Sequence, residues 1–226
     1  MDYINQFLFG ILPYIAGAVF LLGCLVRFER GQYSWRAQSS QTLDNGPMFR
    51  WASIFFHVGI LLLLLGHVFG LLTPQWLYHG LGLSTSTKQL LAIVAGGIFG
   101  AVCFIGLTYL VWRRLFNERV RANSAPADTF ILLLLYLQLI TGLLTIPVST
   151  GHMDGAVMVQ LANWAQYIVT FRAGAWEFIV DVHWIYKLHV FLGLLMFLSF
   201  PFTRLVHIWS FPVIYLGRSY QLVRRH

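Results

Sequence analysis

The sequence predicts an all-α integral membrane protein, a bundle of five transmembrane helices. Three observations lead to this fold class. The 226-residue chain is 58% hydrophobic and only 10% charged, whereas soluble domains carry roughly 25% charged residues. Five segments are long and apolar enough to cross the hydrocarbon core, which takes about 20 residues. Most of the arginines gather in alternate connections between these segments, as the positive-inside rule requires of cytoplasmic loops.

The five expected spans follow one another along a single domain, residues 1–226. They cover about residues 3–26, 51–72, 89–112, 129–148 and 184–209. The first lacks a basic n-region and is not followed by a small-residue cleavage site, so we expect it to be retained as a span. The last contains Pro201, which we expect to kink it.

The charge pattern predicts the orientation of the bundle. Twelve basic residues fall in the connection after the first span, in the connection after the third and in or beside the C-terminal tail: Arg27, Arg30, Arg36, Arg50, Arg113, Arg114, Arg119, Arg121, Arg204, Arg218, Arg224 and Arg225. With these in the cytoplasm, an odd number of spans places the N-terminus outside and the C-terminus inside. The net charge of +7 therefore indicates membrane topology rather than nucleic-acid binding.

The connection between the fourth and fifth spans is longer than the others. Within it, residues 157–171 mix apolar residues with Gln160, Asn163 and Gln166. This stretch is too short and too polar for a span, so we expect an amphipathic helix lying in the outer interface. A sixth span would put the C-terminal arginines outside and contradict the charge rule.

Four histidines lie inside two of the expected spans, His57 and His67 in the second, His189 and His207 in the fifth. Ionisable residues in lipid are costly and indicate functional sites, and histidine is a common haem ligand. Because the two spans are antiparallel, His57 is at the depth of His207 and His67 at the depth of His189. The pattern predicts two bis-histidine irons, hence an electron carrier without an open site for substrate.

The geometry supports this pairing only in part. Along ideal helices, ten residues span about 15 Å and eighteen span about 27 Å, so a kink at Pro201 is needed to bring the depths closer. The alternative is that these histidines form hydrogen bonds that hold neighbouring helices together. The remaining histidines are expected to be surface side chains: His79, His152, His183 and His226.

The two cysteines exclude other redox groups. Cys24 and Cys103 are far apart and in expected spans, and the sequence has no CxxCH motif. Covalent c-type haem attachment and an iron–sulfur cluster within this chain are therefore excluded.

The histidine pattern suggests functional roles for several other polar and small residues. Lys88, at the outer end of the second connection, either snorkels to headgroups or donates to a quinone oxygen beside the outer haem. Gly66 either permits close helix packing or makes room for a porphyrin face or quinol. Arg36, Arg113 and Arg114 sit at the cytoplasmic edge, where they either set topology or pair with haem propionates.

Specific stretches carry a resemblance over nearly the whole chain. They are PYIAGAVFLLG, GQYSWRAQSSQ, FFHVGI, GHVFGLLTP, GLLTIPVSTGHMDG, KLHVFLG, FPFTRLVHIWSFPVIYL and YQLVR. In these the sequence resembles the gamma subunit of bacterial respiratory nitrate reductase, the di-haem membrane cytochrome b of that complex. The resemblance implies two non-covalent b haems, the inner on His57 and His207 and the outer on His67 and His189. It also matches Lys88 to the quinol-site lysine and Gly66 to a glycine beside the outer haem.

The same resemblance implies a function and partners. Menaquinol or ubiquinol is oxidised near the periplasmic face of the bacterial inner membrane. Electrons then pass to a cytoplasmic iron–sulfur (beta) subunit and on to the molybdenum-containing (alpha) subunit that holds the nitrate site. Two alternatives stay open. One is the di-haem cytochrome b of a formate dehydrogenase or hydrogenase, passing electrons to quinone. The other is a membrane anchor or small transporter that uses histidines for proton relay.

Overall fold

The computed structural model describes residues 2–35, 43, 46–210 and 217, and these are helical or irregular with no strand. Five helical segments are long and apolar enough to span a membrane: Asp2–Gly31, Pro47–Leu72, Thr85–Phe116, Pro126–Thr150 and Trp184–Phe202. The predicted fold class is confirmed. Two of these helices begin with proline, at the position where a missing N–H costs no helical bond.

The elements are as follows. The α-helices are α1 (Asp2–Gln6), α2 (Leu12–Gly31), α3 (Pro47–Leu72), α4 (Gln75–Gly80), α5 (Thr85–Phe116), α6 (Glu118–Ala122), α7 (Pro126–Thr150), α8 (Ala156–Val169) and α9 (Trp184–Ser199). The irregular helices are η1 (Phe7–Ile11), η2 (Gln32–Ser34), η4 (Ala175–Ile179), η5 (Phe200–Phe202) and η6 (Arg204–Ser210). The helix expected over residues 157–171 corresponds to α8.

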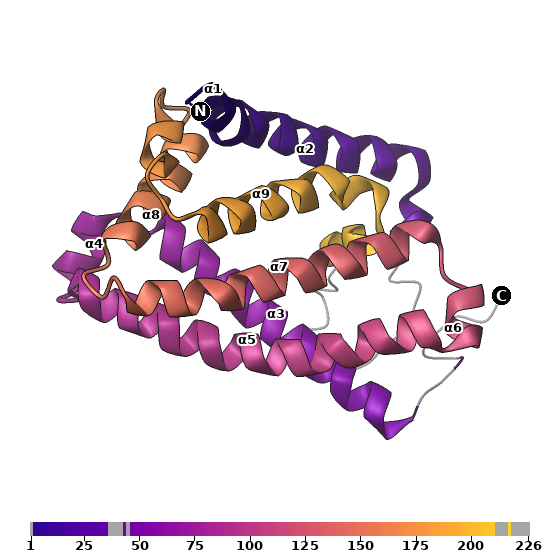
Figure 1. Ribbon diagram of the computed structural model, residues 1–226. Coiled ribbons are helices and arrows are strands. Elements are labelled where there is room, and N and C mark those ends of the chain that lie inside the picture. Colours follow the sequence, from indigo (N-terminus) through magenta and orange to yellow (C-terminus); the bar gives the residue numbers. More distant parts are fainter. Residues whose placement is uncertain (1, 36–42, 44–45, 211–216, 218–226) are drawn as a thin grey trace.

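The long helices pack against one another in an order that differs from the sequence. Helix α2 packs on α9, α9 on α7, α7 on α5, and α5 on α3, while α8 contacts α3 and η4. Figure 1 shows α4 and α8 together at one end of the bundle and α6 at the opposite end. We call these the α8 end and the α6 end.

Close helix contact fixes α3 against α5. A Cβ at Gly59 would lie 2.6 Å from the Cβ of Cys103, and a Cβ at Gly106 would lie 2.5 Å from the carbonyl oxygen of Ala52. Small residues let the two backbones approach in this way. The rest of α3 has few protein neighbours, because only 6% of its apolar window is buried, against 22–28% for the other four spans.

The fifth span differs from the prediction. The sequence predicts one kinked helix over residues 184–209, but the α-helix ends at Ser199 and η5 follows it. Thr203 is extended, with φ −121° and ψ 178°, and η6 then carries His207. Pro201 therefore ends the α-helix rather than bending it, because its ring cannot continue the hydrogen-bond ladder.

Helix α2 supports this break. A Cβ at Gly23 would lie 2.7 Å from the ring of Pro201, so only glycine leaves room for the proline here. The Arg27 guanidinium donates to the carbonyl oxygens of Pro201 at 2.7 Å and Thr203 at 2.8 Å. These carbonyls would otherwise be left without partners at the helix end.

Candidate functional site

The rings of His67 on α3 and His189 on α9 lie close together near the α8 end. Their ring centroids are 5.9 Å apart and their planes differ by 34°. Two imidazoles on opposite sides of one metal ion, each at a metal–nitrogen distance of about 2 Å, have centroids roughly 6 Å apart. The observed centroid separation is close to this value.

The hydrogen bond of His67 leaves one nitrogen able to bind a metal. Its Nδ1 lies 2.7 Å from the carbonyl oxygen of Leu63. A carbonyl only accepts, so Nδ1–H donates and Nε2 keeps its lone pair. Metal-binding histidines commonly fix their tautomer through a hydrogen bond of this kind.

His57 and His207, the other two histidines in the expected spans, share the hydrogen-bond pattern of His67. His57 Nδ1 donates to the Ser53 carbonyl oxygen at 2.7 Å, and His207 Nδ1 donates to the Arg204 carbonyl oxygen at 2.5 Å. Each Nε2 is again left with its lone pair.

His189 meets side chains of α7 instead of its own backbone. Its Nδ1 lies 3.2 Å from Thr141 Oγ1, and its Nε2 lies 3.3 Å from the amide nitrogen of Gln138. A Cβ at Gly142 would lie 2.9 Å from the ring of His189, so this glycine makes space for the imidazole. The sequence analysis missed all three α7 residues. Two polar residues three apart in an apolar span were the available signal.

Few protein atoms surround the α3 histidines and the glycines near them. His57 and His67 are exposed although they lie in a span, and a Cβ at Gly66 or Gly70 would meet nothing within 4 Å. Helix α9 packs on α2 and α7, while α3 packs on α5 and α8. The structure thus holds α3 beside α9 without packing the two as neighbours.

The donor set suits a haem better than a bare ion. Over the part of the chain that the structure describes, no group of three or more His, Cys, Asp or Glu side chains could hold a metal. Structural zinc ions take four protein ligands, whereas a haem supplies its own four nitrogen ligands and needs two more from the protein. A site with two histidines therefore fits a b haem.

Lys88 reaches the same end of α3 as His67. Its ammonium donates to the carbonyl oxygens of Gly70 at 3.0 Å and Thr73 at 3.5 Å. It also lies 4.2 Å from the ring centroid of Tyr78. The half-buried ammonium is held one turn beyond His67 and Gly66 along the helix.

The three arginines expected near haem propionates at the cytoplasmic edge differ in their surroundings. Arg36 lies outside the described residues. Arg113 is 3% exposed, with its guanidinium 4.3 Å from the ring centroid of Phe49. Arg114 donates to Ser124 Oγ at 2.7 Å and lies 3.8 Å from an Asp128 carboxylate oxygen.

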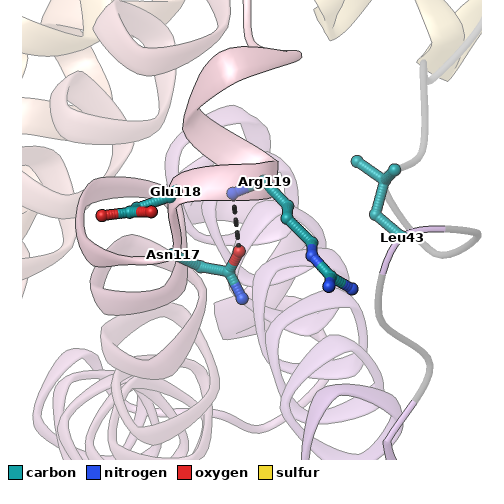
Figure 2. Close-up of a pocket in the computed structure, with 4 residues that line it drawn as sticks. All are labelled: Leu43, Asn117, Glu118 and Arg119. Atoms are coloured by element: carbon teal, nitrogen blue, oxygen red, sulfur yellow. Dashed lines mark hydrogen bonds between the residues drawn. The ribbon is translucent and has the colours of Figure 1, made fainter.

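A hollow at the α6 end has a structural explanation. It is lined by Leu43, Asn117, Glu118 and Arg119, and Figure 2 shows the Glu118 and Arg119 side chains pointing in opposite directions. Asn117 Oδ1 accepts from the backbone N–H groups of Arg119 at 3.1 Å and Val120 at 3.2 Å, which caps α6. The polar side chain of Asn117 in this hollow is thus used to cap α6. No histidine lines the hollow.

The five long apolar helices define a multi-pass membrane protein. The family model described as nitrate reductase gamma subunit matches residues 5–226. The chain belongs to this family, and so is the membrane subunit of a multi-subunit oxidoreductase.

Individual relatives match from end to end. The chain is 53% identical to the respiratory nitrate reductase 1 gamma chain of Escherichia coli (strain K12), over the whole of both chains. It is 49% identical to the respiratory nitrate reductase 2 gamma chain of the same organism, over 99% of this chain and 98% of that one. It is 36% identical to the nitrate reductase gamma chain of Bacillus subtilis (strain 168), over 98% of each.

Proposed function

We propose that this chain oxidises quinol near the α8 end and passes the electrons through two b haems toward the α6 end. There they leave to the cytoplasmic iron–sulfur subunit and, through it, to the molybdenum subunit that reduces nitrate. The observation that carries the proposal is the close approach of His67 and His189, whose ring centroids are 5.9 Å apart. Family membership adds the nitrate reductase context.

The chain's own residues have distinct roles in this scheme. His67 and His189 would hold the outer haem and His57 and His207 the inner one, each through Nε2. A b haem held by two histidines would supply one-electron transfer and leave no open position for substrate. Quinol must therefore bind beside the outer haem, where the Lys88 ammonium hydrogen-bonds a quinol oxygen and Gly66 leaves room for the ring.

The reaction balances across the membrane. Quinol loses two electrons and two protons at the α8 end and becomes quinone. The protons leave to the outside, while nitrate, two electrons and two cytoplasmic protons give nitrite and water on the partner. The orientation rests on the arginine-rich connections at the α6 end. Moving one electron inward through the full field costs about 2.3 kcal/mol per 100 mV, so the energy of the reaction is conserved.

Haem content tests the proposal directly. We expect the purified protein to show about two b haems per chain in a pyridine haemochrome assay and in a reduced-minus-oxidised spectrum. His67→Ala and His207→Ala should each remove one haem. His183→Ala is the matched control, because His183 only caps α9, accepting from the N–H of Ile185 at 3.3 Å. Folded protein without haem, from cells that supply haem, would overturn the proposal.

The alternatives predict different outcomes. A formate dehydrogenase or hydrogenase cytochrome has the same red colour but co-purifies with a catalytic partner on the outside. A proton-relaying transporter or anchor is colourless. Quinol-dependent nitrate reduction that is lost in His67→Ala, and retained in His183→Ala, supports the proposed direction over both.

A further inference from the structure

His189 is held differently from the other three paired histidines. His57, His67 and His207 donate Nδ1–H to backbone carbonyls of their own segments, whereas the Nδ1 partner of His189 is the hydroxyl of Thr141 on α7. We infer that Thr141 is a positioning residue that sets the tautomer and ring orientation of His189. The inference rests on the proposed function, in which His189 binds the outer haem.

The direction of the hydrogen bond follows from counting protons. The Thr141 hydroxyl donates its one proton to the carbonyl oxygen of Gln138, 3.0 Å away. Its oxygen then only accepts toward His189, 3.2 Å away. Nδ1 of His189 must carry the hydrogen, and Nε2 keeps the lone pair.

A second contact gives the same tautomer. The amide nitrogen of Gln138 lies 3.3 Å from His189 Nε2, and an amide –NH₂ group is a donor. It meets a lone pair only if Nε2 is unprotonated. With the amide in this orientation, Thr141 and Gln138 agree on the Nδ1–H tautomer. The Nε2 lone pair of His189 accepts from Gln138, so this amide would have to turn away for Nε2 to bind iron.

Packing makes Thr141 able to hold the ring in place. The residue is 3% exposed, so water does not compete for its hydroxyl. A Cβ at Gly142 would lie 2.9 Å from His189 Cε1 and 3.5 Å from Nδ1, so the imidazole lies directly against the α7 backbone. The ring is confined on this side and oriented by one hydroxyl.

The hydroxyl also influences the electronic character of the ligand. A hydrogen bond accepted from Nδ1–H makes the imidazole more basic. A more basic axial ligand favours the oxidised iron and lowers the reduction potential. Removing the Thr141 hydroxyl should therefore raise the potential of the outer haem and leave the inner haem unchanged.

The test compares three variants of the assembled complex. Thr141→Val removes the hydroxyl and keeps the shape, and Thr141→Ser keeps the hydroxyl. Thr145→Val makes the same change one turn away, where the Thr145 hydroxyl donates to the carbonyl oxygen of Gly142 at 2.6 Å. Haem content, an optical redox titration and the low-spin EPR signals are recorded for each.

We expect the potential of the outer haem to rise, or this haem to be lost, in Thr141→Val alone. An unchanged outer haem in Thr141→Val overturns the inference. So does an equal change in Thr141→Ser or Thr145→Val, which would mean that packing rather than the hydroxyl matters. If the parent complex holds no haem at the His67 and His189 site, the proposed function itself is wrong, and the two failures are thereby distinguished.

Discussion

A histidine inside a membrane helix has a hydrogen-bond acceptor close by, the carbonyl oxygen one turn earlier. His57 uses Ser53 and His67 uses Leu63 in this way. A carbonyl has two lone pairs, so it accepts from the imidazole without losing its helical bond. Each ring nitrogen then has one defined role, and the side chain needs no polar neighbour from another helix.

Lys88 provides the first test at the residue scale. Its ammonium already has acceptors at Gly70 and Thr73, so its charge is held in place beside the proposed quinol site. We expect Lys88→Ala to lower kcat/KM for quinol at least tenfold, about 1.4 kcal/mol, with both haems retained. Steady-state assays with a soluble quinol analogue measure this.

Arg172→Ala is the matched control for Lys88. Arg172 is an exposed cation that follows α8, 5.4 Å from the ring centroid of Tyr167. Its loss should leave quinol kinetics unchanged. If Lys88→Ala behaves like Arg172→Ala, Lys88 serves only to satisfy the end of α3.

Gly66 provides a second residue-scale test. A Cβ there meets nothing within 4 Å, so the protein alone tolerates a side chain at this position, and replacing glycine in a helix gains up to about 1 kcal/mol. A group bound in that space would meet the new side chain. We therefore expect Gly66→Leu to fold normally but to lose the outer haem or quinol activity.

Gly17 gives the comparison for Gly66. It is also in a span and also has open space around its Cβ position, but it is on α2, away from the histidines. Gly17→Leu should leave haem content and activity unchanged. Normal haem and normal quinol oxidation in Gly66→Leu would show that nothing occupies the space beside Gly66.

The sequence predicted the ligand candidates but not their supports. Histidines in apolar spans are conspicuous because charge and hydrogen-bonding capacity are costly there. Thr141 and Gln138 are also polar, yet a single sequence does not show which neighbouring helix they face. Their role depends on α7 packing beside α9, which is a tertiary contact.

At the scale of elements, the break in the fifth span decides where His207 lies. A continuous helix would put His207 about 27 Å beyond His189, too far to match the 15 Å between His57 and His67. The extended residue Thr203 and the segment η6 replace that straight path. Pro201 in the sequence indicated an irregularity in this span. The shape of the break also depends on Gly23 and Arg27 of α2, which the sequence does not place beside it.

Arg27 provides the test at this scale. It donates two charge-assisted hydrogen bonds to the carbonyls of the break, each worth about 1.5–3 kcal/mol. We expect Arg27→Ala to destabilise the segment carrying His207 by about 3 kcal/mol and to lower the temperature at which the inner haem is released. Loss of inner-haem absorbance on heating measures this.

Arg30 on the same helix is exposed and supplies the control. Arg30→Ala removes the same charge from the same end without touching the break. Equal loss of inner-haem stability in both variants would assign the effect to surface charge rather than to the carbonyls of Pro201 and Thr203.

At the scale of the whole molecule, hydropathy predicted the spans but not their order in space. Each span is apolar on most faces, so its sequence does not say which neighbour it contacts. The structure packs the second span on α5 and α8, and the fifth between α2 and α7. The low burial of α3 is the consequence that matters, because it leaves the histidine face of this helix accessible.

Orientation in the membrane is a property of the whole chain and can be tested on native loops. The two cysteines are both buried, so new surface thiols provide the labelling signal. Ser86 is exposed at the start of α5, near the α8 end, and Asn123 is exposed after α6. Because the arginine-rich connections lie at the α6 end, we expect the α8 end to face outward.

In intact cells a membrane-impermeant maleimide should therefore modify Ser86→Cys and leave Asn123→Cys unmodified. In inside-out vesicles Ser86→Cys should be protected. Labelling of Ser86→Cys only in inside-out vesicles would reverse the bundle, place the proposed quinol site on the cytoplasmic side and remove the charge separation from the scheme. The direction of energy conservation thus depends on the same charge asymmetry that predicts the topology.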